Sequence, residues 1–374
     1  MAALTWCLVL SSGAGAQIVH GQRPQITQGL DYISWEASGA KEFTISQWYV
    51  PITVRAGLRE NLELGIYSAA ARSESDLSET DNTLTGLIDS KLQLSASFLD
   101  DGLLLSTGVS LPTGKTKLDE PESDLVGWLT ADFLNFPVKN PGEGLNIFGQ
   151  LGMAAPLGRW VFGAAGAVYV AGEYSPYDSD LKYTPGSRLV GNVGIERNWE
   201  NRHRLATDFV VIYSTDDKVA GKPVFRDGVQ LDGRVIGQTT MGSLTVDGAF
   251  RAIIRGKDYL PDGEGSLVSE LNNRNGNDLR FHLGMKLSLA PGFAVNVSGE
   301  AKLLAANNYP DSSDFFEGDA HLTGIGGGLT IGLGRQSRLD IGARAWTGSS
   351  DQALGLKNLD FKGLEVFQRL SVTL

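Results

Sequence analysis

The sequence predicts an all-β fold, a transmembrane antiparallel up-and-down β-barrel of about 16 strands, with 14 as the alternative. Apolar and polar residues alternate along many segments, which is the period of a strand. Residues 243–257, SLTVDGAFRAIIRGK, place Leu244 and Phe250 on one face and Asp247 and Arg251 on the other. The candidate strands are about 10 to 14 residues long, the length that crosses a membrane at a tilt.

The predicted connections alternate between tight turns and longer polar links. The short ones lie at 58–61, 99–102, 157–159, 199–202, 241–243, 290–292 and 334–337, and the longer ones near 73–86, 112–143, 174–186, 215–226, 258–277, 306–319 and 348–360. This rhythm is typical of bacterial outer-membrane barrels, whose periplasmic turns are short. Fifteen strands are clear after Glu42, and an even count requires one more, for which residues 24–36 are the candidate.

A soluble β-sandwich is the rival architecture, because its strands also alternate. Sandwich strands are usually five or six residues long, and the short and long links would not need to alternate along the whole chain. Strand length and link rhythm therefore favour the barrel.

The first 16 residues read as a secretory signal peptide. Ala2 to Leu10 is mostly apolar, and Ala14-Gly15-Ala16 fits a cleavage site of small residues before Gln17. Residues 17–374 then form one barrel. No long apolar run follows residue 16, which excludes a membrane-spanning helix.

Composition excludes several other functions. The net charge of −11 argues against nucleic-acid binding, which needs a basic surface. One Cys excludes a disulfide framework, and His20, His203, His282 and His321 lack the spacing of a metal site. We therefore predict no metal, no cofactor and no catalysis. A barrel enzyme, the rival, would require a His paired with a carboxylate at the outer rim.

Two glycine-containing segments resemble nucleotide motifs and fail on spacing. In GVSLPTGKT, five residues separate Gly108 from Gly114, whereas the phosphate loop needs four. GIGGGLTIGLG, residues 324–334, lacks the dinucleotide spacing and opens no helix. Its glycines at 324, 326 and 328 share one face, which would leave a hollow in the lumen for a ligand path or a folded-in loop.

The longest link, 112–143, is predicted to contain a short helix. The segment PESDLVGWLTADFLNF begins like a helix, and apolar residues recur in it at helical spacing. The loop is expected either to fold into the lumen as a plug or to lie on the rim. The plug candidates are Leu125, Trp128, Leu129 and Phe133.

Charged residues of both signs recur on the predicted inner faces of consecutive strands. These lumen-lining candidates are Arg204, Asp208, Asp232, Arg234, Asp247, Arg251, Arg255, Arg280, Lys286, Glu300, Lys302, Asp340, Arg344, Glu365 and Arg369. Mixed signs on adjacent strands predict pairing across the sheet. The ladder is either a salt-bridge network that stiffens the wall or a charged constriction that selects solutes.

Two segments near the start resemble a known family. Residues 52–69, ITVRAGLRENLELGIYSA, and 108–117, GVSLPTGKTK, resemble a hairpin and a Leu-Pro-Thr-Gly strand end of an outer-membrane family associated with the meta-cleavage pathway of phenol degradation. Ala56 replaces the family's usual Tyr, and Arg59-Glu60 replaces a Thr-Asp pair. Members are similar to hydrocarbon and fatty-acid transport barrels. The resemblance implies an uptake pore for small, aromatic or apolar compounds.

The expected function is therefore that of an outer-membrane channel for passive uptake of small solutes. The alternative is a non-transporting barrel, either structural or anchoring a surface partner. The expected partners are outer-membrane lipid, a small-molecule solute and the outer-membrane assembly machinery. The C-terminal segment GLEVFQRLSVTL resembles the strand that this machinery recognises, with Leu374 in place of the usual aromatic residue.

Overall fold

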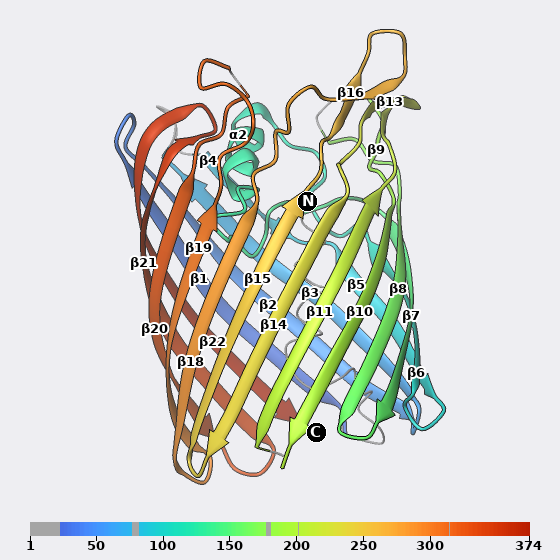
Figure 1. Cartoon of the computed structure of the whole chain (residues 1–374), viewed down its shortest axis with the longest axis vertical. Coiled ribbons are helices and arrows are strands. Elements are labelled where there is room, and N and C mark those ends of the chain that lie inside the picture. Colours follow the sequence, from blue (N-terminus) through green and yellow to red (C-terminus); the bar gives the residue numbers. More distant parts are fainter. Residues whose placement is uncertain (1–22, 77–81, 177–180, 201, 314) are drawn as a thin grey trace.

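A computed structural model describes residues 23–76, 82–176, 181–200, 202–313 and 315–374. The expected signal peptide lies outside the described residues. In this part of the chain the strands form a closed antiparallel barrel, with the C-terminus at the end that carries the tight turns (Figure 1). No helix among the described residues is long and apolar enough to span a membrane.

Seventeen strands form the wall. They are β1 (Gln25–Ser38), β2 (Phe43–Arg59), β3 (Leu62–Ser75), β4 (Asn82–Leu87), β5 (Ser90–Phe98), β6 (Leu103–Leu111), β7 (Asn146–Leu157), β8 (Trp160–Ala171), β10 (Arg188–Trp199), β11 (His203–Ser214), β14 (Gln230–Met241), β15 (Leu244–Arg255), β18 (Asp278–Ala290), β19 (Phe293–Leu304), β20 (Ala320–Gly332), β21 (Ser337–Ala353) and β22 (Leu356–Thr373). Because β4 and β5 both pair with β3 and follow each other along it, the wall has 16 strand positions, as predicted.

Pairing of the first and last strands closes the barrel. β1 pairs with β22 from Gln25 opposite Thr373 to Ser38 opposite Asp360. The extra strand expected at 24–36 is therefore β1. Closure leaves no free sheet edge in the hydrocarbon, where an unpaired peptide group would cost several kcal/mol.

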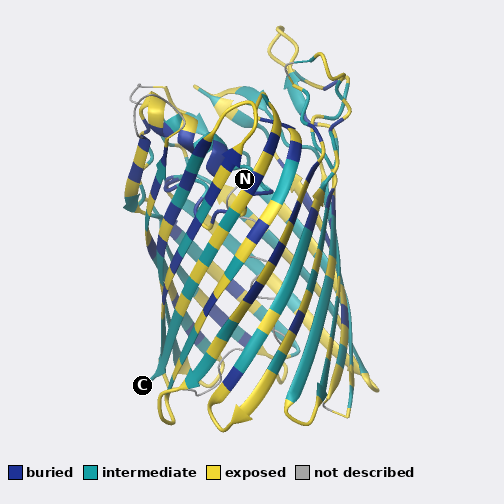
Figure 2. Ribbon diagram, turned by 90° about the vertical axis from the view of Figure 1, so that its left-hand side faces the viewer, coloured by how far each residue is buried: buried dark blue, intermediate teal, exposed yellow. Residues whose placement is uncertain are grey.

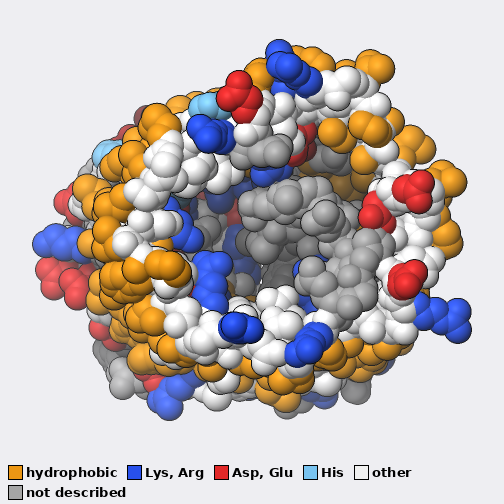
Figure 3. All heavy atoms as spheres, turned by 90° about the horizontal axis from the view of Figure 1, so that it is seen from below, with side chains coloured by type: hydrophobic (Ala, Val, Ile, Leu, Met, Phe, Trp, Pro, Cys, Tyr) orange, Lys and Arg blue, Asp and Glu red, His pale blue; other side chains and the backbone are white. Residues whose placement is uncertain are grey.

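The outside of the wall is apolar. Along β20, exposed and buried residues alternate, and the outward Ile325 is 69% exposed while Leu322 is 1% exposed. The same banding recurs along other strands (Figure 2). Seen from the short-turn end, hydrophobic side chains cover the outside of the ring, and Lys and Arg side chains gather around its opening (Figure 3). This is the surface expected of a barrel in lipid.

One of the predicted long links is wrong, and another is shorter than predicted. At 348–360, β21 continues to Ala353 and β22 begins at Leu356, so that only Leu354 and Gly355 turn, with φ of 48° and 80°. At 73–86, β3 extends to Ser75 and β4 begins at Asn82. The outward residues of these extensions include Ser349, Asp351 and Asp360. Residues 349–352 of β21 are polar on both faces, whereas in β22 the inner Leu359 and Phe361 are apolar and the outward Asp360 and Lys362 are polar. Above the lipid-facing band the apolar side of β22 is therefore the inner one, so the outward alternation of the lower strand does not continue there.

Small sheets rise above the rim on one side of the barrel (Figure 1). β9 (Tyr183–Thr184), β12 (Asp217–Val219) and β13 (Lys222–Phe225) form one, and β16 (Tyr259–Pro261) with β17 (Leu267–Ser269) forms the other. They belong to three of the long links, which makes this end the one with the long loops.

The main apolar core lies inside the upper barrel rather than between sheets. Helix α2 (Glu120–Leu129) and the residues after it pack against the inner wall of β1, β2, β4, β20, β21 and β22. The buried members are Ile33, Trp35, Ala37, Phe43, Ile45, Leu84, Leu118, Leu125, Trp128, Leu129, Phe133, Leu134, Phe136, Leu322, Trp346, Ala353, Leu359 and Phe361. The loop thus covers apolar side chains that would otherwise face a wet lumen.

The glycine face of β20 does not leave an open hollow. A Cβ added at Gly324 would overlap the ring of Trp346, and one at Gly326 would lie 3.3 Å from Nε of Arg344. Two large side chains of β21 therefore occupy the space that these glycines leave. The glycines let the indole and the guanidinium lie flat against the wall, which keeps them out of the centre of the lumen.

Candidate functional site: the lumen beneath the inserted loop

The base of the inserted loop is fastened at the break between β4 and β5. The carboxylate of Asp89 accepts hydrogen bonds from the backbone of Gly114 at 2.8 Å and of Glu143 at 2.7 Å. A Cβ at Gly114 would overlap the carbonyl of Pro141, so the two ends of the loop touch. One carboxylate therefore holds both ends of the loop at the wall.

Helix α2 turns the apolar side of the loop toward the wall. Asp119 and Glu122 form a capping box at its start, and Lys115 forms an ion pair with Glu122. The plug candidates Leu125, Trp128, Leu129 and Phe133 are 0%, 7%, 1% and 8% exposed. All four lie inside the barrel against the inner wall, and Trp128 packs 4.6 Å from the ring of Phe43.

The segment that follows the helix is tied to the wall by polar contacts. The indole of Trp35 donates to the carbonyl of Leu134 at 2.8 Å. The amide of Gln47 donates to the carbonyl of Val138 at 2.8 Å and accepts from its N–H at 2.9 Å. The Gln47 side chain thus pairs with both the N–H and the C=O of Val138, as the backbone of a neighbouring strand would.

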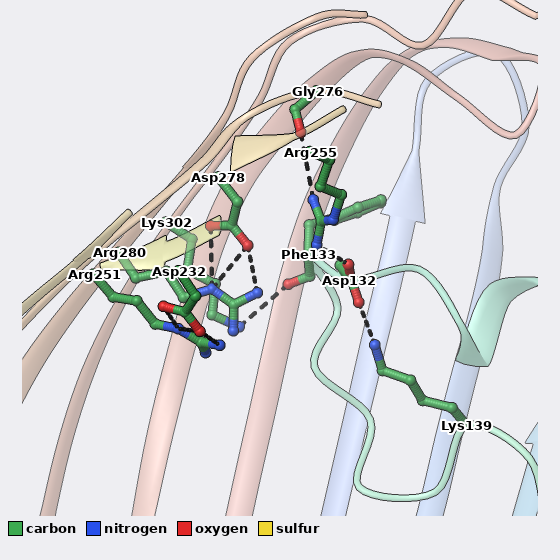
Figure 4. A network of polar contacts seen from close by, with 10 residues as sticks. All are labelled: Asp132, Phe133, Lys139, Asp232, Arg251, Arg255, Gly276, Asp278, Arg280 and Lys302. Carbon is green, nitrogen blue, oxygen red and sulfur yellow. Dashed lines mark hydrogen bonds and ion pairs between the residues drawn. The ribbon is translucent and has the colours of Figure 1, made fainter. Parts of the chain in front are cut away.

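Asp132 joins the loop to a further strand of the wall, β15. It forms an ion pair with Lys139 of the loop, and its Oδ2 accepts from Nη2 of Arg255 on β15 at 2.5 Å (Figure 4). Burial raises the pKa of the Asp132 carboxyl, but the cations of Lys139 and Arg255 outweigh that and hold the pKa below its ordinary value. The carboxylate is therefore charged at neutral pH.

Acid is expected to loosen this tie. Because the pKa of Asp132 is lowered in the folded protein, its stabilisation is complete above about pH 4 and is lost as the pH falls through the lowered pKa. Open-channel current noise should rise below about pH 4 in the parent, and Asp132→Asn should show it already at neutral pH. Asp124→Asn, on the exposed face of α2, is the control and should remain quiet at neutral pH. If the current noise at pH 7 were equal in the parent, Asp132→Asn and Asp124→Asn, Asp132 would not hold the loop in place.

A row of four cations crosses the wall below the loop. Arg234, Arg251, Arg280 and Lys302 lie directly opposite one another on β14, β15, β18 and β19. At one end of the row Arg234 lies directly opposite Asp208 of β11, as the predicted pairing of opposite signs requires, but within the row the direct neighbours carry like charges. Like charges in this position are destabilising.

The compensating acids lie beside or diagonal to the row. Arg234 donates to Asp208 at 2.6 Å. Arg251 reaches diagonally to Asp232, with both Nε and Nη2 donating. Arg280 bonds Asp278, two residues earlier on the same strand, at 2.9 Å (Figure 4). The side chains of Asp232 and Asp278 are 2% and 5% exposed, so the acids lie behind the guanidinium groups.

Lys302, the fourth cation, is buried under the loop. Its Nζ lies 3.4 Å from the carbonyl oxygen of Phe133 and 5.0 Å from the centre of the Trp346 ring. It therefore joins the wall to the loop and does not face the lumen.

A cavity of about 660 Å³ lies between the loop and this wall. Arg251 and Arg280 line it. Four further cations, Lys139, Arg188, Arg255 and Arg369, also line it, together with the acids Asp31, Asp132, Asp227, Asp258 and Glu365. Its apolar lining is Ile33, Tyr49, Phe136, Pro137, Ile212 and Ile253. The cavity thus combines guanidinium groups with an aromatic and aliphatic surface.

A chain of alternating charges continues around the wall from β15 to β22. His282 lies 3.1 Å from Asp247 and 3.3 Å from Glu300. Glu300 accepts from Arg344 at 2.9 Å, and Arg344 reaches Glu365 at 3.3 Å. His282 thus faces the lumen between two carboxylates. They lie on the lumen wall, not at the outer rim where a barrel enzyme would need them.

The remaining predicted residues lie apart from the cavity or take other partners. Arg204 pairs with Glu196 at 2.7 Å rather than with Asp208. Asp340 pairs with Arg338 at 2.7 Å near the short-turn end. For Lys286 the described residues provide no recorded ion pair. Arg369 binds Asp31 of β1 across the closing seam, with one contact of 2.6 Å.

Several residues of the site were not among the predicted ones. Asp31, Asp132, Lys139, Arg188 and Asp278 all belong to the ion pairs or to the cavity lining. Asp278 could have been predicted, because it lies two residues from Arg280 on the same strand and therefore on the same inner face. Asp132 and Lys139 lie in a loop, where no parity exists to reveal them. Within the described residues no group of His, Cys, Asp and Glu could hold a metal ion.

Neither a family model nor a curated protein matches the sequence. Among solved structures, the chain is similar to OccAB1 of Acinetobacter baumannii, with a TM-score of 0.50, 10% identity and coverage of 94% of this chain and 96% of that one. It is also similar to a mutant of the TodX monoaromatic hydrocarbon channel, with a TM-score of 0.49, 9% identity and coverage of 98% and 94%. OprD of Pseudomonas aeruginosa gives 0.46, 13% identity and 96% of each chain.

At such low identities the likeness is one of fold. The closed wall and the apolar exterior are the evidence for this architecture in the chain itself. The chain thus has the fold of a closed outer-membrane-type β-barrel with 16 strand positions.

Proposed function

We propose that this barrel is a passive uptake channel that prefers small solutes carrying an anionic group. The carrying observation is the row of cations in register across β14, β15, β18 and β19, two of which face the cavity. A row that merely stiffened the wall would alternate in sign, since opposite charges in direct register stabilise a sheet and like charges destabilise it.

The bracing of the row supports a role in binding. Arg251 and Arg280 each use Nε and Nη2 on a buried acid, and the described contacts leave Nη1 for the cavity. Guanidinium groups held in this way are preorganised, so that a carboxylate or phosphate group meets N–H donors without ordering a flexible side chain. The acids behind them reduce the net field, which suits transit rather than tight retention.

The apolar lining supports solutes with an aromatic or aliphatic body. Tyr49, Phe136 and Ile253 line the same cavity as the guanidinium groups. The resemblance of residues 52–69 and 108–117 to the family linked to phenol degradation points the same way. We therefore place small aromatic acids within the proposed solute class, and we propose no catalytic step.

Reversal potentials in planar bilayers test the proposal. Under a potassium chloride gradient, the purified barrel should conduct with chloride favoured over potassium, and benzoate should reduce the chloride current by occupying the cavity. Cation preference would contradict the anionic solute class. Absence of conductance, also after shortening of loop 112–143, would contradict transport and favour the non-transporting structural or anchoring barrel.

A further inference from the structure

An arginine lies on the membrane-facing side of the wall near the short-turn end. Arg197 lies two residues before Trp199, where β10 ends and the tight turn begins, and it shares the outward parity of Leu189 and Val193 on β10. Its neighbour Glu196 has the opposite parity and pairs inside with Arg204. Arg197 therefore projects outward, where a strand residue normally meets lipid.

Two tryptophans enclose this guanidinium. The carbon Cζ of Arg197 lies 4.8 Å from the centre of the Trp160 ring and 4.6 Å from that of Trp199. Trp160 is the direct cross-strand neighbour of Arg197 on β8, and Trp199 lies two residues further on the same face of β10. Both rings are within the range of a cation–π contact, so they hold the side chain at one height on the barrel.

No acid among the described residues is recorded as a partner of this guanidinium. Among the described residues the structure records no ion pair or hydrogen bond from the Arg197 side chain, and its Nε is buried without a partner. By contrast, the wall arginines Arg204, Arg234 and Arg251 each bind a carboxylate. A charge on the lipid side close to the interface is tolerated, but it still attracts an anion.

We propose that Trp160, Arg197 and Trp199 bind the phosphate group of a membrane phospholipid in the leaflet on the side of the tight turns. The short turns of such barrels face the periplasm, so the ligand belongs to the periplasmic leaflet. The tryptophans lie at the level of the headgroups, where indole rings are enriched. The guanidinium then offers the phosphate its outer N–H groups as charge-assisted donors. This lipid site does not depend on the proposed transport function.

Native mass spectrometry of the detergent-purified barrel tests the site. Dioleoylphosphatidylglycerol should remain bound, whereas dioleoylglycerol, which has the same acyl chains and no phosphate, should not. Arg197→Gln should weaken retention of the phospholipid about tenfold, the effect of one lost charge-assisted contact. Trp199→Leu should weaken it about threefold.

Arg159→Gln is the matched control, because Arg159 is an exposed arginine in the adjacent turn before Trp160. It should retain the lipid as the parent does. Heat-modifiable migration on gels should be the same for all variants, since none changes a hydrogen bond of the wall. Unchanged retention in Arg197→Gln, an equal loss in Arg159→Gln, or equal retention of dioleoylglycerol would each overturn the proposal.

Discussion

Deletion of residues 116–140, with a short glycine linker from Lys115 to Pro141, is expected to raise the single-channel conductance about threefold or more. A barrel of this strand number encloses an aqueous channel unless something fills it, and here α2 and residues 132–139 occupy the upper lumen. The deletion can close without strain because the loop ends touch: a Cβ at Gly142 would lie 2.9 Å from the carbonyl carbon of Gly114. Conductance in planar bilayers is the measurement.

The same deletion should destabilise the barrel without unfolding it. Trp35, Leu359 and Phe361, at most 1% exposed, would meet water in the opened lumen, at a cost of about 1.5–3 kcal/mol for each side chain. The wall pairing stays complete, so the protein should still migrate as a heat-modifiable band, with a lower transition temperature. A lower transition temperature together with a larger conductance would show that the loop both fills the lumen and packs its apolar side against the wall.

A loop outside the lumen supplies the control. Shortening the hairpin between β16 and β17, residues 262–266, removes chain that rises above the rim. Its conductance should equal that of the parent. If the plug deletion also left the conductance unchanged, the inserted loop would not limit flow, and the plug hypothesis would be wrong.

The fold could be predicted from the sequence because the wall obeys local rules. The alternation of side chains is a property of each strand, and turn length follows from which end of the barrel a connection lies at. β1 was found by requiring an even strand count. At the link 348–360 this local rule fails, because residues 349–352 of β21 are polar on both faces and β22 turns its apolar residues Leu359 and Phe361 inward.

The site could be predicted only as a set of inward residues, not as pairs. Parity places Arg251 inside, but the register between strands decides whether its neighbour is Arg280 or Asp278. Ion pairs between segments that are distant in the sequence could not be predicted from alternation at all. Arg255 meets Asp132, 123 positions away, and Arg369 meets Asp31, 338 positions away across the closing seam. Such contacts follow from closure of the barrel and from the path of an irregular loop.

Joint replacement of Arg251 by Gln and Asp232 by Asn is expected to lower the permeability ratio of chloride to potassium about twofold. The pair removes one positive and one negative charge, so the net charge of the protein does not change. What changes is the position of charge, because the guanidinium lines the cavity and the acid is buried behind it. A nearby charge changes the potential felt by an ion far more than one shielded behind the wall.

The double variant is easier to interpret than Arg251→Gln alone. Arg251→Gln alone would leave Asp232, 2% exposed, buried without its cation, and such a change costs about 3–5 kcal/mol. Any loss of selectivity could then reflect a distorted wall. With both partners neutral, Gln and Asn can hydrogen-bond to each other, and the transition temperature should remain close to that of the parent.

A second ion pair of the same kind provides the comparison. Arg338 and Asp340 lie 2.7 Å apart near the short-turn end of β21, outside the cavity. The corresponding double change, Arg338→Gln with Asp340→Asn, is equally neutral overall and should leave the permeability ratio as it was. If the cation row selects solutes, only the pair at the cavity affects the ratio. If the row merely braces the wall, both double variants retain the parental ratio, because neither alters the net charge of the lumen.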